Sequence, residues 1–294
     1  MPRISVVLCT YNGEKYLEQQ LESIINQSIK PDELIIADDA SSDHTCEIIE
    51  KYLQHFKFIQ FYKNANNLGF QKNFQQALLK ASGDFIAISD QDDIWAPTKL
   101  EILLASFDEN TLLAYSDSLF IDENGKITGT SMSDEKSMIE GRNPLAFIRY
   151  NCVSGHALMI RNELLSEVLP FPEHIFYDRW FAFVASMHGK LKFVDAPLVL
   201  HRRHSASSGK VWAHKQKILQ AKQQMLASFS QYALNKSPET TESLSMLLIA
   251  ENSGWLKRRY LRLKFGILYG KQYFAIKKFS KLRLLYRIVK CKDY

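Results

Sequence analysis

An acidic cluster, Asp90-Gln91-Asp92-Asp93, is the segment whose residue types point most directly to chemistry. Crowded carboxylates repel one another unless a cation or hydrogen-bond donors lie nearby. Mg²⁺ favours oxygen ligands and is usually held by one or two carboxylates together with substrate phosphates. The cluster therefore predicts a site for Mn²⁺ or Mg²⁺. The alternative is a solvated acidic turn that precedes a helix.

Asp178 is a second candidate, because it lies among aromatic side chains in the segment Tyr177-Asp178-Arg179-Trp180-Phe181. Partial burial would raise the pKa of its carboxyl group toward that of a useful general base. The alternative is an acidic residue in the first turn of a helix, where the helix dipole stabilises the negative charge.

A basic segment, His201-Arg202-Arg203-His204, follows a predicted strand. Guanidinium groups bind phosphate oxygens through paired hydrogen bonds, and imidazole is a common metal ligand. The segment therefore suits a diphosphate bound beside a metal ion. A basic surface turn is the alternative.

The elements that would position these residues alternate between strand and helix patterns over residues 4–95. Strands joined by helices of this length form a parallel sheet, and ligands bind at the carboxyl ends of its strands. The predicted strands cover residues 4–10, 34–37, 58–62 and 85–89. Each of them ends in polar residues, namely Thr10, Tyr11 and Asn12, then Asp38 and Asp39, then Asn67 and Gly69, and last Asp90, Asp92 and Asp93. This coincidence predicts a nucleotide-binding site.

The turn after the first strand, residues 10–15, lacks the GxGxxG pattern of dinucleotide-binding folds. Its absence argues against a nicotinamide-dependent dehydrogenase. Asp38 and Asp39 at the end of the second strand could still bind a base or a ribose. The alternative for this pair is a turn that precedes the next helix.

The pattern beyond Pro97 is less regular. We expect strands at 112–122, 155–160 and 191–200, and a helix at 177–188. The polar stretch 122–140 is expected to be a mobile loop that closes over the site as a lid. From about Val211 onward the chain is expected to be helical.

Charge is distributed unevenly, because residues 251–294 contain 13 Lys and Arg residues and only two acidic ones. A basic helix with aromatic residues can lie on an anionic membrane surface. Residues 209–294 are therefore expected to form a helical tail that binds a membrane or contributes to a homodimer. A helix packed on the body of the protein is the alternative.

Composition excludes several other classes. The chain has no apolar run of 18 or more residues, so no transmembrane helix is expected, and its N-terminus is not typical of a signal peptide. The four cysteines lie far apart, which argues against a disulfide framework or a zinc site. The body is mildly acidic and lacks known reader motifs, so nucleic-acid binding is not expected. We expect a cytoplasmic protein on the inner face of the cell membrane.

The chain resembles family 2 of the inverting glycosyltransferases, which have the GT-A fold, over about residues 4–208. The resemblance rests on segments 6–13 (VVLCTYNG), 34–45 (LIIADDASSDHT), 67–69 (NLG) and 89–95 (SDQDDIW). The last segment is similar to the rhamnosyltransferase-like branch that builds surface polysaccharides. The resemblance implies an α/β fold with a Rossmann-like, mostly parallel sheet flanked by helices. Its nucleotide-binding half would cover about residues 1–95 and its acceptor half about 96–208, with the helical tail at 209–294 appended.

The resemblance also implies residue roles. Asp178 matches the catalytic base, and Asp92 and His204 match the metal ligands. Arg202 matches a residue that meets the diphosphate. The full donor-binding set would be Thr10, Tyr11, Asn12, Glu14, Asp38, Asp39, Asn67, Gly69, Asn73, Asp90, Gln91 and Arg202. Two positions depart from the family pattern, since Ala40 replaces a glycine and His201 stands where tyrosine is common.

The implied reaction transfers a sugar from a nucleotide-diphosphate donor, dTDP-rhamnose or a UDP-hexose, with inversion at the anomeric carbon. The acceptor would be a glycan or a lipid-linked saccharide on the way to O-antigen, capsule or lipooligosaccharide. Two alternatives remain open. One is a nucleotidyltransferase, although no early glycine-rich phosphate loop is present. The other is a catalytically inactive scaffold of the same fold at the membrane.

Overall fold

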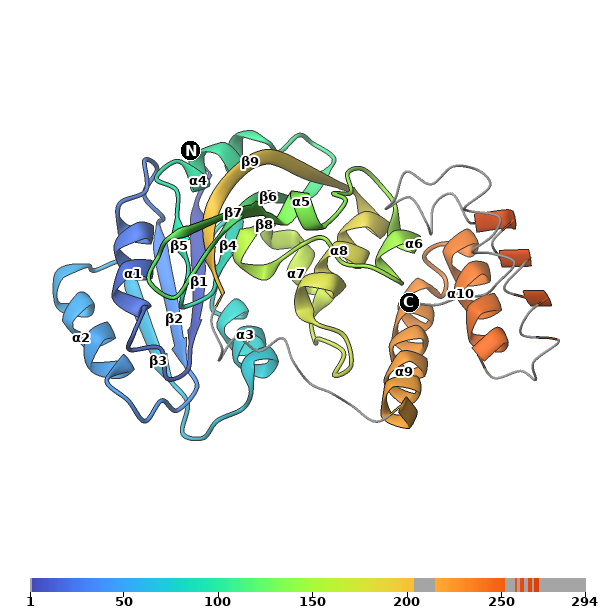
Figure 1. Ribbon diagram of the computed structural model, residues 1–294, viewed down its shortest axis with the longest axis horizontal. Helices are drawn as coiled ribbons and strands as arrows, with labels where there is room; N and C mark the ends of the chain where they lie inside the picture. Colours follow the sequence, from blue (N-terminus) through green and yellow to red (C-terminus); the bar gives the residue numbers. More distant parts are fainter. Residues whose placement is uncertain are drawn as a thin grey trace.

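One curved sheet runs through the body of the protein, and helices cover both of its faces (Figure 1). The computed structural model describes residues 2–203, residues 215–251 and several positions between 257 and 269. The strand order is β3-β2-β1-β4-β8-β6-β9-β5, and β7 pairs with β6 off this path. The predicted α/β class with helices on both sides of the sheet is confirmed.

The first half of the sheet is parallel, as the sequence predicts. Strands β1, β2, β3 and β4 pair side by side in parallel register. Helices α1, α2 and α3 connect them in turn. The bounds are β1 Ile4–Thr10, α1 Leu17–Ile25, β2 Glu33–Asp38, α2 Thr45–His55, β3 Ile59–Lys63, α3 Phe70–Leu78 and β4 Phe85–Ser89.

The continuous apolar runs of the central strands arise because both faces of the sheet are buried. Along β1, Val7 and Cys9 enter one core beneath α3 and α8. Val6 and Leu8 point to the opposite core beneath α1 and α4. At about 25 cal/mol per Å² of buried apolar surface, such two-sided burial is the main force that holds strands and helices together.

The second half of the sheet is mixed. Strand β8 runs antiparallel to both β4 and β6, whereas β9 runs parallel to β6 and antiparallel to β5. The strand bounds are β5 Ile94–Trp95, β6 Thr111–Ile121, β7 Ile127–Ser131, β8 Leu158–Arg161 and β9 Lys190–Arg202. The helix bounds are α4 Lys99–Ala105, α5 Met132–Glu135, α6 Pro144–Phe147, α7 Leu165–Val168 and α8 Tyr177–His188.

Two local predictions in this half are wrong. The stretch 122–140 is not loop throughout, because β7 pairs with β6 and α5 follows it. Ser131 and Asp134 cap α5 reciprocally, and this capping box fixes the segment. The strand expected at 155–160 begins only at Leu158, because residues Gly155–Ala157 form a 3₁₀ turn.

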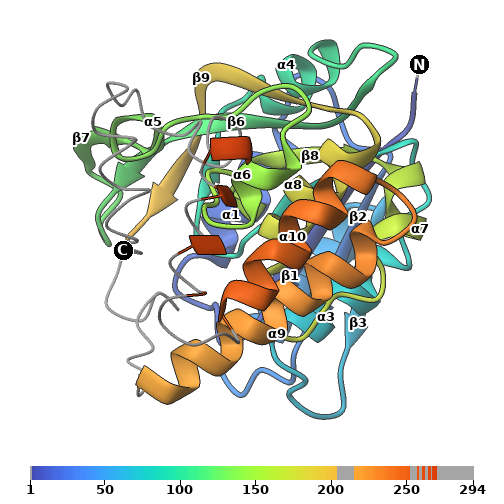
Figure 2. The same ribbon diagram turned by 90° about the vertical axis from the view of Figure 1, so that its right-hand side faces the viewer.

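The predicted helices at the C-terminal end are confirmed as α9 (Lys215–Ala233) and α10 (Pro238–Glu251), which lie side by side (Figure 2). They pack on the body through Phe229, whose ring centroid lies 4.3 Å from that of Phe183 in α8. Among the described residues, no helix combines the length and apolar character needed to cross a bilayer. Much of the basic stretch after Gly254 lies outside the described residues, so its membrane and dimer roles stay predictions.

Ala40 occupies the turn after β2 with φ of +63°, in the left-handed region. This conformation costs a non-glycine residue about 1–2 kcal/mol, whereas glycine's extra freedom in the unfolded chain costs about 0.4–1 kcal/mol. We therefore expect Ala40→Gly to raise the free energy of unfolding by about 0.5–1 kcal/mol, measured by urea denaturation. Ala65→Gly, at an exposed position without positive φ, is the control and should not stabilise. Equal effects at both positions would contradict the strain at Ala40.

Candidate active site

The carboxyl ends of β1, β2 and β4 meet at one edge of the sheet, where the sequence places its polar residues. Thr10 at the end of β1 is paired with Asp38 at the end of β2, and its hydroxyl donates a hydrogen bond of 2.9 Å to the Asp38 carboxylate. The adjacent end of β4 carries Asp90 to Asp93. The predicted strand-end cluster is therefore one continuous surface.

Asp38 and Asp39 are both buried, and protein groups already occupy their carboxylates. Asp38 accepts hydrogen bonds from Thr10 and from the backbone N–H of Ser41. Asp39 accepts from the N–H groups of Leu68 and Gly69, both at 2.8 Å. Both residues thus shape the loops around the strand ends, and their contact with a nucleotide base stays a prediction.

The same loops also contain or contact three other residues of the predicted donor site, Asn67, Gly69 and Asn73. The Asn67 amide donates to the Asp39 carbonyl, and Gly69 sits at the start of α3 with φ of +84°. Asn73 is buried and donates to the carbonyl of Ala37 at 2.8 Å. Of this group, only Asn67 and Gly69 reach the surface of the predicted donor site.

Gln91 joins the end of β4 to the first turn. Its side-chain oxygen accepts from the Tyr11 N–H at 2.8 Å, and its amide nitrogen donates to the Tyr11 carbonyl at 3.0 Å. Tyr11 itself is 48% exposed, which leaves its ring free to face a ligand. Asn12 and Glu14 are also exposed, although Asn12 accepts from the Ser42 N–H and Glu14 pairs with His44.

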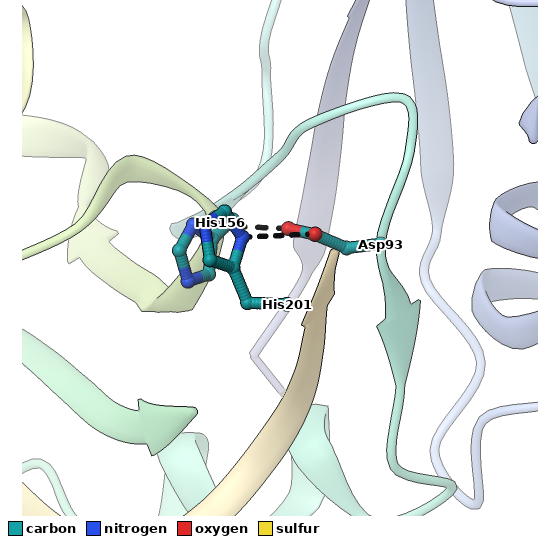
Figure 3. A group of neighbouring side chains, drawn as sticks. All are labelled: Asp93, His156 and His201. Atoms are coloured by element: carbon teal, nitrogen blue, oxygen red, sulfur yellow. Dashed lines mark hydrogen bonds and ion pairs between the residues drawn. The ribbon is translucent and has the colours of Figure 1, made fainter. Parts of the chain in front are cut away.

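The structure brings together three potential metal ligands, Asp93, His156 and His201, whose ligand atoms lie within 4.8 Å of one another (Figure 3). Their side chains come from the end of β4, from the 3₁₀ turn before β8 and from the end of β9. His201 Nδ1 lies 3.0 Å from one Asp93 oxygen, and His156 Nδ1 lies 3.7 Å from the other. The two imidazole rings stack with centroids 4.2 Å apart.

Asp93 is fully buried, and its Oδ2 atom has no hydrogen-bond partner. Burial disfavours its charged form, but the two imidazoles and the His201 hydrogen bond outweigh burial and lower its pKa to about 2. The carboxylate is therefore ionised with one buried oxygen free to take a ligand. An orphaned buried oxygen beside two imidazoles is the donor set expected of a cation site.

Two hydrogen-bonding partners, Ser118 and Lys99, hold His156 in place. Its Nε2 atom lies 3.0 Å from the Ser118 hydroxyl, and its backbone carbonyl accepts a hydrogen bond of 2.6 Å from the amino group of the buried Lys99. Burial, and then the neighbouring His201, lowers the pKa of the His156 imidazole. In the tautomer that donates Nε2–H to Ser118, Nδ1 presents a lone pair toward Asp90 and Asp93, as metal ligation requires.

The sequence resemblance implies Asp92 and His204 as the metal ligands. His204 lies outside the described residues, and Asp92 is half-buried beside the cluster of Asp93, His156 and His201. His156 was missed altogether, since no spacing in the sequence connects it with Asp93. The segment 201–204 did predict a histidine metal ligand at the end of a late strand. In the structure, His201 of this segment is the residue that contacts Asp93.

Arg202 was predicted to meet the diphosphate, but the structure places its side chain inside the protein, with 1% exposed. Its guanidinium donates to the carbonyls of Asp92, Asp122 and Glu123 and to the side chain of Gln19. In this structure Arg202 fixes the turn that carries Asp92 and Asp93. Its contact with a diphosphate stays a prediction.

Asp178 lies in the first turn of α8, as the sequence predicts. Burial, as the main cause, raises the pKa of its carboxyl group to about 6, and the negative charge of Asp90 adds to the shift. Hydrogen bonding to the Arg179 N–H opposes burial but does not cancel it. A carboxyl group with this pKa is matched to proton abstraction near neutral pH.

Tyr177 packs against the turn that carries His156. A Cβ atom added to Gly155 would lie 2.0 Å from the Tyr177 hydroxyl, so only glycine permits this approach. Burial raises the pKa of Tyr177, and the charges of Asp90 and Asp178 contribute to the same shift. The metal-ligand cluster and Asp178 therefore belong to one packed site.

Comparison with known proteins shows the family to which this chain belongs. A family model described as glycosyl transferase family 2 matches residues 5–169. The chain is 33% identical to an uncharacterized glycosyltransferase of Methanocaldococcus jannaschii over 209 residues, which covers 68% of this chain and 71% of that protein. An uncharacterized glycosyltransferase of Haemophilus influenzae is 28% identical over 225 residues, 73% of this chain and 70% of the relative. The protein belongs to glycosyltransferase family 2.

The fold is also similar to that of a solved structure. S. aureus TarS, residues 1–349 in complex with UDP-GlcNAc, aligns with a TM-score of 0.64 at 20% sequence identity. The alignment covers 93% of this chain and 79% of the TarS chain. The GT-A fold expected from the resemblance is thereby confirmed. The family match shows that the enzyme is a glycosyltransferase.

Proposed function

We propose that the protein transfers a sugar from a nucleoside-diphosphate sugar to a saccharide hydroxyl, with inversion at the anomeric carbon. The observation that carries this proposal is a buried carboxyl group, Asp178, with its pKa raised to about 6 partly by Asp90, on the helix whose Tyr177 packs against the turn of His156. His156 belongs to the cluster with Asp93 and His201. UDP-GlcNAc bound to TarS supports a nucleotide-sugar donor. A UDP-hexose and dTDP-rhamnose are both candidates for the donor.

Asp178 is the general base in this mechanism. Its carboxylate takes the proton of the acceptor hydroxyl as that oxygen attacks the anomeric carbon. The attack occurs on the face opposite the nucleotide, so one displacement inverts the configuration. The transition state then resembles an oxocarbenium ion, as in glycoside hydrolysis.

Asp93, His156 and His201 would hold a divalent cation, with Asp92 beside them. The free buried oxygen of Asp93 and the lone pair of His156 fit such an ion. Two imidazoles favour Mn²⁺ over Mg²⁺, because Mg²⁺ prefers oxygen ligands in an octahedral arrangement. When bound, the ion would supply positive charge against the departing diphosphate. Lys99 keeps the His156 backbone in position for this role.

Inversion can be tested without knowing the acceptor. When only the donor is supplied, water slowly attacks the anomeric carbon in place of the acceptor hydroxyl, and the donor is hydrolysed. We expect the purified enzyme with Mn²⁺ to hydrolyse UDP-GlcNAc and release first the sugar anomer opposite to that of the donor. Proton NMR can follow this anomer before the free sugar equilibrates. Release of the same anomer as the donor would contradict a single displacement with Asp178 as base.

A further inference from the structure

A cavity of about 660 Å³ lies between the start of α3 and the loop that leads into α8, the helix that carries Asp178. Its walls include Phe70 and Phe176, whose rings stack with centroids 5.8 Å apart. Both rings face solvent, since Phe70 is 48% exposed and Phe176 is 64% exposed. A volume of this size is typical of small-molecule sites.

The cavity is close to the reacting groups. Phe176 precedes Asp178 by two residues, which span at most about 7 Å of chain. Phe70 also contacts Tyr177, with ring centroids 6.4 Å apart. At its other end the cavity reaches Leu68 and Gly69, whose N–H groups bind Asp39 at the predicted donor site. Its lining therefore extends from the residues that bind Asp39 to a residue two positions before Asp178.

The walls of the cavity are held in place before any ligand arrives. The Gln71 side chain donates to the Pro172 carbonyl at 2.6 Å, and the Gln75 side chain accepts from the Phe171 N–H at 2.9 Å. These two hydrogen bonds hold α3 against the loop that precedes α8. A rigid wall lowers the entropy lost when a ligand binds.

The lining combines apolar faces with hydrogen-bonding groups. The aromatic faces of Phe70 and Phe176 carry negative quadrupole charge and attract the C–H groups of a pyranose ring. The exposed side chains of Lys72, Gln76 and Glu173 stand around them as donors and acceptors for hydroxyl groups. An exposed aromatic platform with a polar rim is suited to a saccharide and poorly suited to a purely apolar chain.

On these grounds, and resting on the proposed transfer reaction, we propose that this cavity binds the acceptor saccharide. One pyranose ring stacks on Phe176 and Phe70, and its neighbour presents a hydroxyl group to Asp178. The hydroxyl oxygen forms the new bond to the anomeric carbon of the donor, its proton passes to Asp178, and the nucleoside diphosphate leaves with the electrons of the broken bond.

The test uses saturation-transfer-difference NMR on the full chain with Mn²⁺ and UDP present. The probes are tetrasaccharides of glucose, galactose or N-acetylglucosamine. We expect ring C–H protons of at least one probe to be saturated by the wild type, Phe176→Ala to reduce this signal at least fivefold, and Phe176→Trp to retain it. Tyr62→Ala, an exposed aromatic that does not line the cavity, is the matched control and should leave the signal unchanged.

Donor binding separates this inference from the proposed function. Calorimetric affinity for UDP-GlcNAc should be equal in the wild type and Phe176→Ala, because Phe176 lies on the acceptor side. A wild type that binds and hydrolyses the donor, but whose probe signal is absent or insensitive to Phe176→Ala, overturns the acceptor site alone. Saturation of an added polyprenyl phosphate in place of every saccharide would likewise overturn it. Failure to bind or hydrolyse any nucleotide sugar would instead contradict the proposed function.

Discussion

Asp178→Asn is expected to lower the rate of sugar transfer by about 10² to 10⁴-fold, which is the usual contribution of a general base. Asparagine keeps the size of the side chain but cannot accept the proton of the acceptor hydroxyl. Donor affinity, measured by calorimetry with UDP-GlcNAc, should stay within about twofold of the wild type, as expected for a group that acts only in the transition state. Asp195→Asn, the same change at an exposed carboxylate in β9 that does not line this site, is the control and should retain the rate of transfer.

The pH dependence of the same variant gives a second readout. Burial raises the pKa of Asp178 to about 6, and the base works only when it is ionised. We therefore expect kcat/KM of the wild type to rise with pH up to about 6 and then to level off, with a loss of about tenfold at pH 5. The residual activity of Asp178→Asn should lack this rise. A wild-type profile that is flat between pH 5 and 7 would exclude Asp178 as the base.

His201→Ala is expected to weaken Mn²⁺ binding and to lower the rate of transfer by about 10³-fold. The physical reason is the loss of a metal ligand. The charge of a bound cation stabilises such a transition state by several kcal/mol, and each 1.36 kcal/mol changes the rate by a factor of ten. Electron paramagnetic resonance of free Mn²⁺ measures the affinity directly. His201 suits the test because it is only half-buried, which limits the effect of the change on folding.

Two comparisons make the His201 result specific. His55→Ala removes an exposed histidine at the end of α2 and should change neither Mn²⁺ binding nor activity. Asp92→Ala tests the ligand that the sequence resemblance implies. If His201→Ala binds Mn²⁺ like the wild type while Asp92→Ala does not, then the ion is not held by Asp93, His156 and His201.

The parallel half of the fold could be predicted because its signals are local. Each strand from β1 to β4 is a short apolar run, and each connecting helix repeats its apolar residues with helical spacing. The polar residues that follow Thr10, Asp38 and Ser89 are adjacent in space for the simple reason that parallel strands end at the same edge. Asp178 was found in the same way, from its place among aromatic residues at the start of a helix.

The metal-ligand cluster could not be predicted, because it depends on pairings between distant segments. His156 approaches Asp93 only because β8 pairs with β4, and His201 only because β9 reaches β5. The residues next to either histidine in the sequence do not predict which strands will pair. The buried hydrogen bonds of Asp38, Asp39 and Arg202 are equally long-range, so residue type suggested ligand contacts where the structure shows internal ones.

The most direct test of the whole account is nucleotide release by the purified full chain. The enzyme is incubated with UDP-, dTDP- and GDP-sugars, with a mixture of saccharide acceptors, and with Mn²⁺, Mg²⁺ or EDTA, and the free nucleoside diphosphate is measured. We predict release from one donor class, fastest with Mn²⁺ and abolished by EDTA. No release from any donor together with no calorimetric binding of any nucleotide would contradict a working transferase, and release that is unaffected by EDTA would contradict the metal site.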